Sequence, residues 1–167
     1  EMIQREVRRK GLVGNIKLGA GGIREVEFIV QSLQLIQGGR DRRLRERNTL
    51  KVLPFLVDAK LLPEAVANCL AKSYQFLRRL EHCIQELAEK QTQQLPDSIE
   101  EQEALCFAMN FANWQALITQ LEKHQKLVNE HFNLLFGEDR KKALTQDDFF
   151  QSLAEGHISS AQLLIHI

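Results

Sequence analysis

The chain has 167 residues, which is enough for one domain with a hydrophobic core. Hydrophobic residues make up 44% of it and charged residues 26%, and 22 basic side chains balance 22 acidic ones. A formal net charge of zero leaves no electrostatic footprint for nucleic acid, and the sequence contains neither an apolar run long enough to span a membrane nor a signal peptide. We therefore expect a cytoplasmic protein that binds neither nucleic acid nor membrane.

The three cysteines, Cys69, Cys83 and Cys106, are widely spaced, and each falls in a helical pattern. They are typical of small buried apolar residues in a reducing compartment. No Cys-x-x-Cys pair occurs, and His124 and His131 are too far apart for one metal ion. We expect no metal site.

The chain begins inside an amphipathic pattern over residues 2–10, which predicts the last turns of a helix that ends at Gly11. Its last residues form an apolar run without a terminator. We therefore expect a segment of a longer protein, divided into the end of a preceding helix (1–14), a helical bundle domain (15–137), and a linker with the start of a following helical segment (138–167).

The glycine segment, residues 15–27, follows. Residues 16–18 predict a short extended piece, which passes through glycines into a long apolar helix that Gly38 and Gly39 end. With Lys17 and Arg24 on either side, Gly21 and Gly22 at the helix start are compatible with a cradle for a phosphate or carboxylate. Three glycines before a helix are more often a tight turn with only a structural role.

The charged residues of this segment leave further alternatives open. Arg24 needs a carboxylate or phosphate partner, which is either a structural salt bridge or a substrate. Glu25 and Glu27 lie on opposite faces of the helix and cannot chelate one ion together. Glu25 is placed to stabilise the helix start, and Glu27 to pair with Lys17 or with a partner arginine.

Residues 40–47 form a basic connector, which is either a solvated surface or a contact for an acidic partner or a phosphate. Asn48 or Thr49 is placed to cap a short helix, which Pro54 bends or starts. Pro63 opens the longest helix, over residues 64–91. Its apolar positions follow two registers of seven and form the spine of an antiparallel bundle: Leu70, Leu77 and Ile84, with Leu80 and Leu87 beside them.

Two more helices complete the predicted bundle. Ser98 and Glu101 form a capping box for one, and Asn113 starts the other, which Gly137 closes. A polar linker and a short helix after Thr145 follow. The predicted fold is all-α, an antiparallel helical bundle with a short extended glycine-rich segment leading into it.

The spine carries a charged group that we interpret as structural or as an interface. Arg78 and Glu81 are three residues apart and Arg79 is adjacent, and Glu27 belongs to the same class. His82 is more typical of a hydrogen-bonded histidine than of a ligand.

The stretch Lys-Leu-Gly-Ala-Gly-Gly-Ile-Arg-Glu-Val-Glu-Phe, residues 17–28, resembles the signature of the glutamine synthetase adenylyltransferases, bifunctional enzymes that attach AMP to glutamine synthetase and remove it. The related uridylyltransferases carry a similar lysine, double glycine and arginine without the Glu-Val-Glu-Phe continuation. The likeness extends through residues 74–82, 91–96 and 108–114, and covers most of residues 2–137.

The resemblance implies the helical domain that follows the N-terminal nucleotidyltransferase domain of such an enzyme. No Asp-x-Asp pair is present, so we expect no catalytic residue in this segment and no activity of the segment alone. ATP and Mg²⁺ are the cofactors expected for the parent enzyme, with none for the segment. Expected partners are the upstream nucleotidyltransferase domain, glutamine synthetase and a PII-type signalling protein.

In this interpretation the segment is an accessory or regulatory domain beside the nucleotidyltransferase active site. Lys17, Gly21, Gly22 and Arg24 are then its candidate nucleotide- or phosphate-binding residues. The alternative is a protein-interaction module that binds a signalling protein or glutamine synthetase without contributing to catalysis.

Overall fold

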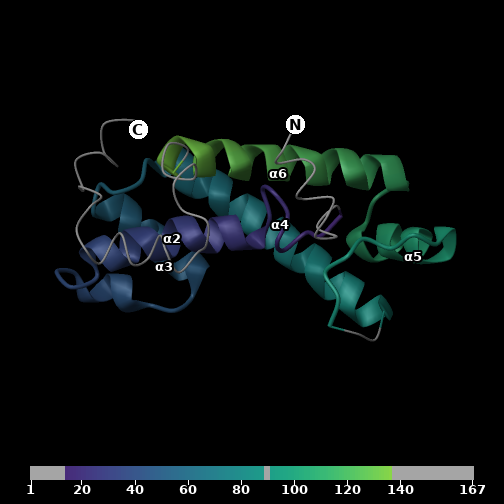
Figure 1. Ribbon diagram of the computed structural model, residues 1–167, viewed down its shortest axis with the longest axis horizontal. Helices are drawn as coiled ribbons and strands as arrows, with labels where there is room; N and C mark the ends of the chain where they lie inside the picture. Colours follow the sequence, from purple (N-terminus) through teal and green to yellow (C-terminus); the bar gives the residue numbers. More distant parts are fainter. Residues whose placement is uncertain (1–13, 89–90, 137–167) are drawn as a thin grey trace. The chain divides into compact units, whose positions relative to one another are not determined.

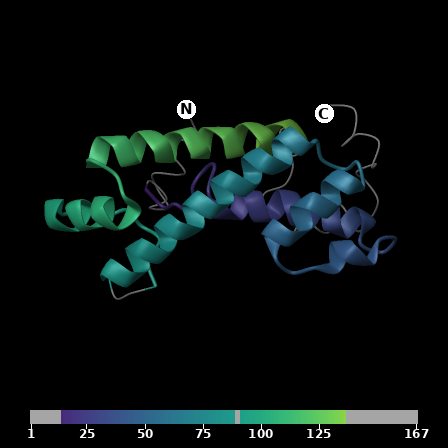
Figure 2. The same ribbon diagram turned by 180° about the vertical axis from the view of Figure 1, so that it is seen from behind.

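The structure is a computed structural model and describes residues 14–88 and 91–136 (Figures 1 and 2). Within these ranges it contains helices and no strand, with one isolated antiparallel bridge between Asn15 and Gln94. The all-α prediction is confirmed. The elements are α2 (Ile23–Gln37), the 3₁₀-helix η1 (Arg42–Arg45), α3 (Thr49–Asp58), α4 (Glu64–Ala88), α5 (Ile99–Met109) and α6 (Trp114–Phe136). The helices predicted before Gly11 and after Thr145 lie outside the described residues, as does the predicted stop at Gly137.

The chain divides into two compact units. The first comprises Glu1–Glu27 and Cys69–Asn129, and the second comprises Phe28–Asn68 and Glu130–Ile167. The division falls within α2, α4 and α6, so each of these helices contributes residues to both units.

The helix starts follow the capping signals in the sequence. The Asn48 side chain accepts hydrogen bonds from Leu50 N and Lys51 N at the start of α3, and the Ser98 hydroxyl accepts one from Glu101 N at the start of α5. Asn113 likewise accepts from Ala116 N before α6. Pro54 lies inside α3, so it does not mark the start of that helix. The helix starts predicted at Asn48, Ser98 and Asn113 are confirmed.

The core of the first unit lies between the beginning of α2 and parts of α4, α5 and α6 (Figure 1). Ser73 of α4 contacts His124 of α6, whereas Phe76, further along α4, packs on Phe111, which precedes α6. These contacts show that α6 runs antiparallel to α4 in this unit. The buried core residues are Ile16, Ile23, Leu77, Leu80, Ile84, Leu105, Cys106, Met109, Leu117 and Leu121.

One position of the predicted spine differs from expectation. Leu70, Leu77, Leu80 and Ile84 are all buried, but Leu87 is 40% exposed. Leu87 is the penultimate residue of α4, in its last turn. The seven-residue pattern therefore continues to the end of α4, past Ile84, which is the last of these positions to be buried.

The second unit has its own apolar interior. Phe28 packs against Phe136 with ring centroids 5.2 Å apart and against Phe132 at 5.7 Å. The arrangement of these rings is edge-on or tilted, which aromatic pairs favour. Phe28 and Phe132 are partly buried and Phe136 is buried. The remaining buried apolar residues of this unit are Ile29, Val30, Leu33, Leu44, Val52, Leu53, Leu56, Leu62 and Ala67.

The three cysteines form no disulfide; only Cys106 is fully buried, and Cys69 and Cys83 are partly exposed. Burial raises the pKa of the Cys106 and Cys83 thiols, which keeps them protonated and unreactive. In the described part of the chain, every helix is too short or too polar to cross a membrane.

Candidate functional site

The glycine segment begins with a turn that Asn15 organises. The Asn15 side-chain oxygen accepts hydrogen bonds from Lys17 N at 3.0 Å and Leu18 N at 2.8 Å, and its carbonyl accepts one from Gly19 N. Residues 16–18 are therefore in turns, and the expected extended piece is corrected. An asparagine side chain that bonds to the backbone just ahead of it favours a turn over an extended strand.

Gly21 is required by its backbone conformation and by its close approach to α6. Its φ angle is +70°, and a Cβ atom at this position would lie 2.0 Å from the carbonyl oxygen of Gln125. Gly22 is similarly confined, since its Cβ would lie 2.6 Å from the carbonyl oxygen of Lys17. Packing of backbone on backbone accounts for both glycines without a ligand.

The backbone donors at the start of α2 are all used inside the protein. A phosphate cradle at a helix start needs free N–H groups that point towards the ligand. Here the N–H groups have acceptors, so a backbone cradle has no free donors; the bonds run from Gly21 to the Glu25 carboxylate (2.9 Å), Gly22 to Gly19 O, Ile23 to Ile16 O, Arg24 to Lys17 O, and Glu25 to Gly22 O.

Arg24 lies on the surface rather than in the interior. Its guanidinium contacts the Glu27 carboxylate at 3.2 Å, and the Tyr74 hydroxyl donates to the other oxygen of Glu27 at 3.3 Å. Arg24 is 46% exposed, so this pair is partly solvated. The partner expected for Arg24 is thus a neighbouring carboxylate on the same helix, and part of the guanidinium still faces solvent.

Lys17 pairs with a carboxylate from α4. Its ammonium lies 3.1 Å from Glu81 Oε1, and Arg78 donates to Glu81 Oε2 at 2.5 Å. Glu81 is 2% exposed, and the Lys17 contact is an ion pair without hydrogen-bond geometry. Two cations are therefore held at one buried carboxylate. Sequence spacing predicts the contact between Arg78 and Glu81. Of the two partners expected for Glu27, Lys17 or an arginine, the structure shows the arginine, Arg24, while Lys17 pairs with Glu81.

The remaining residues of the spine connect elements of the first unit. Arg79 donates to the carbonyl oxygen of Ala108 at 3.1 Å and so links α4 to α5. His82 is exposed. Within residues 14–88 and 91–136, no group of three or more histidine, cysteine or acidic side chains could hold a metal ion.

His124 belongs to a polar cluster that sequence reasoning missed. One ring nitrogen contacts the Ser73 hydroxyl at 2.9 Å and the other contacts the Gln120 amide at 3.0 Å, and the ring stacks on Phe76. Burial, with a smaller effect of Lys123, lowers the pKa of His124. The imidazole is therefore neutral near pH 7. Ser73 and His124 are far apart in sequence, and no local pattern joins them.

Comparison with known proteins identifies the class to which this helical chain belongs. The family model for GlnD PII-uridylyltransferase matches residues 1–136, which is most of the chain. The chain therefore belongs to the GlnD PII-uridylyltransferase family, a family of nucleotidyltransferases.

Two curated relatives are more specific. The chain is 52% identical over 148 residues to the bifunctional glutamine synthetase adenylyltransferase/adenylyl-removing enzyme of Hahella chejuensis. The matched region covers 89% of this chain and 15% of that protein. The chain is 44% identical to the enzyme of the same name from Nitrosococcus oceani, over 98% of this chain and 17% of that protein. The resemblance carried by residues 17–28 is confirmed, and the chain spans only about a sixth of the length of these relatives.

Proposed function

We propose that this chain is the helical accessory domain of an enzyme that adenylylates and deadenylylates glutamine synthetase, and that it packs beside a nucleotidyltransferase domain. The observation that carries this proposal is the 52% identity to a bifunctional adenylyltransferase/adenylyl-removing enzyme. ATP and Mg²⁺ then serve the parent enzyme. The described residues do not fit a magnesium site, because Glu81 is held by Lys17 and Arg78, and Glu25 is bonded to Gly21 N. The carboxylates that hold Mg²⁺ therefore belong to another part of the enzyme.

We further propose that side chains, not backbone amides, carry any contact between the glycine segment and the nucleotide. Arg24 is the stronger candidate, since its guanidinium is partly exposed and Glu27 fixes its direction. Lys17 already neutralises a buried carboxylate, so a contact with phosphate would compete with its structural role. Gly21 and Gly22 act indirectly, by setting the path of the backbone between these two cations.

The test is Arg24→Ala in the full-length enzyme, with Arg42→Ala as the control that removes an equal charge from an exposed position. If Arg24 contacts the phosphates, kcat/KM for removal of AMP falls by at least about tenfold while the thermal midpoint is unchanged. Arg42→Ala keeps full activity. Unchanged turnover of Arg24→Ala would contradict a role for Arg24 in the nucleotide site.

A second measurement tests the accessory role. The 167-residue chain, purified and checked for helical circular dichroism, is assayed for AMP transfer and phosphorolysis. We expect neither activity, because the chain contains no Asp-x-Asp pair that could hold a metal ion for nucleotidyl transfer. Turnover by the folded chain would contradict the proposal.

The second candidate function is a protein-interaction module. It is favoured by the arginines of the basic connector (residues 40–47), several of which have no acidic partner in the described structure. Under this function Arg24→Ala changes neither kcat nor KM for the nucleotide, and substitutions in the connector weaken the affinity for a partner protein.

A further inference from the structure

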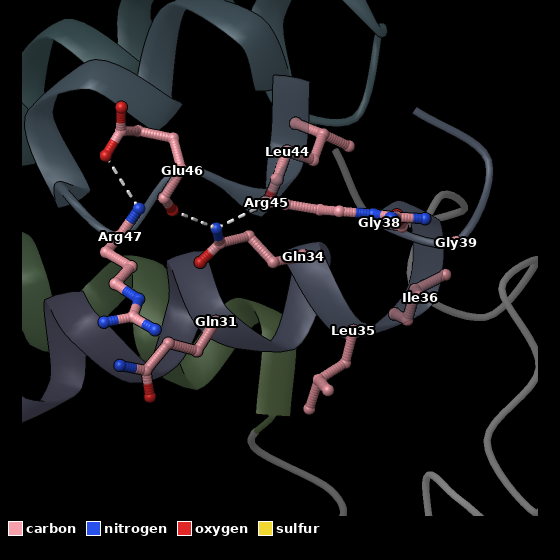
Figure 3. A pocket seen from close by; sticks show the side chains of 10 residues that line it. All are labelled: Gln31, Gln34, Leu35, Ile36, Gly38, Gly39, Leu44, Arg45, Glu46 and Arg47. Carbon is pink, nitrogen blue, oxygen red and sulfur yellow. Dashed lines mark hydrogen bonds between the residues drawn. The ribbon is translucent and has the colours of Figure 1, made fainter. Parts of the chain in front are cut away.

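A groove lies between the second half of α2 and the basic connector, entirely within the second unit (Figure 3). It is an open groove with a volume of about 950 Å³, which is at the upper end of the range for binding pockets. This connector groove is lined by Gln31, Gln34, Leu35, Ile36, Gly38, Gly39, Leu44, Arg45, Glu46 and Arg47. None of these residues belongs to the glycine segment, so the groove is a separate feature from the site proposed above.

Apolar side chains supply part of its lining. Leu44 is buried, Ile36 is partly buried, and Leu35 is 61% exposed at the rim. Covering such an exposed leucine with another apolar group lowers the free energy, because apolar surface is removed from water. The groove therefore favours a ligand that carries at least one bulky apolar side chain.

The polar lining is fixed by internal hydrogen bonds. The Gln34 amide nitrogen donates to the carbonyl oxygens of Leu44 at 2.6 Å and Glu46 at 2.8 Å (Figure 3). Its side-chain oxygen takes no part in these bonds and retains its acceptor capacity. A held amide of this kind is suited to accept a hydrogen bond from a peptide N–H.

Two guanidinium groups in the groove have no carboxylate partner within the described residues. Arg45 donates from Nε to the Gly38 carbonyl at 2.9 Å, which fixes its direction and leaves its terminal nitrogens available. The Glu46 carboxylate accepts from the backbone N–H groups of Arg47 and Asn48. Since these bonds also lower the pKa of Glu46, the carboxylate stays ionised and engaged with the backbone. It does not pair with the Arg47 guanidinium.

Arg43, in the same connector, shows what a compensated arginine looks like here. It contacts Asp41 at 2.8 Å and Asp58 at 3.4 Å. Arg43 does not line the groove, whereas Arg45 and Arg47 do. Arg45 and Arg47 therefore place two uncompensated positive charges at the groove, whereas Arg40 and Arg42 lie outside its lining.

The placement of the two arginines indicates the shape of the ligand. In Figure 3 Arg45 extends towards Gly38 on one side of Gln34, and Arg47 lies on the other side. A single phosphate needs donors that converge on one point. Two separated guanidinium groups with apolar side chains and a fixed amide between them match an extended chain that carries several carboxylates.

We propose that the connector groove binds an extended acidic segment of a protein partner, with a bulky apolar side chain against Leu35 and Ile36 and carboxylates on Arg45 and Arg47. Charge complementarity supplies orientation and the apolar contact supplies affinity. This binding site does not depend on the function proposed for Arg24.

The probe is a short fluorescein-labelled peptide in which Leu-Phe is flanked on each side by glutamates, titrated into the full-length enzyme and followed by fluorescence anisotropy. The test variant is Arg47→Glu, and Arg42→Glu is the matched control, because both residues are exposed and both substitutions change the net charge equally. We expect Arg47→Glu to weaken binding by at least about tenfold and Arg42→Glu by less than about threefold. Leu35→Ser also weakens binding, which a purely electrostatic attraction does not predict.

Several results would overturn the proposal. They are an equal loss in Arg42→Glu and Arg47→Glu, equal affinity for a peptide with glutamines in place of glutamates, and complete displacement of the peptide by inorganic phosphate. The chain also carries its own acidic and aromatic sequence, Asp147-Asp148-Phe149-Phe150. Tighter peptide binding by Asp147→Asn/Asp148→Asn would identify this sequence as the occupant instead of a partner. Dissociation of a dimer by Arg47→Glu would identify a second copy.

Discussion

The glycine segment and the basic connector both place cations beside glycines, but the first pairs both Lys17 and Arg24 with carboxylates, whereas the connector pairs only Arg43 within the described residues. Lys17 lies against the buried Glu81, and Arg24 lies against Glu27. In the described part of the connector, Arg45 and Arg47 have no such partner. A cationic motif is a candidate binding surface only where no carboxylate of the fold already pairs with it.

The largest expected effect concerns the glycine segment. Gly21→Ala destabilises the protein by about 3 kcal/mol or more, because the new Cβ meets the Gln125 carbonyl and the positive φ strains the backbone. Gly39→Ala is the control: no atom lies within 4 Å of its Cβ position, and its effect on stability is within about 0.5 kcal/mol. Urea denaturation of both variants gives the free energies of unfolding. Similar values for the two would mean that the close approach of Gly21 to α6 is not structural.

The next effect concerns the buried carboxylate. Replacing both Lys17 and Arg78 by Met leaves Glu81 buried without a cation, and we expect a loss of about 2 kcal/mol. The expected loss is smaller than for a fully buried network, because both cations are partly exposed to solvent. Adding Glu81→Leu to the double variant restores stability if the unpaired charge is the cause. No recovery in the triple variant would mean that lost packing, not lost charge, explains the effect.

Sequence reasoning predicted the helices because their signals are local. The caps at Asn48 and Ser98 and the spacing of the α4 spine need only neighbouring residues to be recognised. It did not predict that Lys17 pairs with Glu81, since this contact depends on how a turn packs on a distant helix. For the same reason the glycines remained compatible with a phosphate cradle until each backbone donor could be assigned an acceptor.

A smaller effect on stability is expected at His124, whose imidazole is partly buried and neutral near pH 7. Because the pKa of His124 is lowered by burial, the unfolded chain takes up its proton first as the pH falls. The contribution to stability is complete above the ordinary histidine pKa of about 6.5 and is lost progressively as the pH falls through it towards the folded value. His124→Gln, measured by urea denaturation between about pH 7.5 and about pH 5, flattens this dependence. His82→Gln, at an exposed position, keeps the wild-type dependence.

The smallest expected effect on stability separates the connector arginines from one another. Arg47→Ala leaves the thermal midpoint unchanged, because its guanidinium has no partner to lose within the described structure. Arg43→Ala lowers the midpoint slightly, since Arg43 bonds to Asp41, the residue that caps η1, and lies over the Phe55 ring. Differential scanning fluorimetry compares the two at low and high salt, and the Arg43 effect shrinks as salt screens its exposed ion pairs. An equal loss in both variants would show that Arg47 stabilises the connector itself, and its charge would then not be available to a ligand.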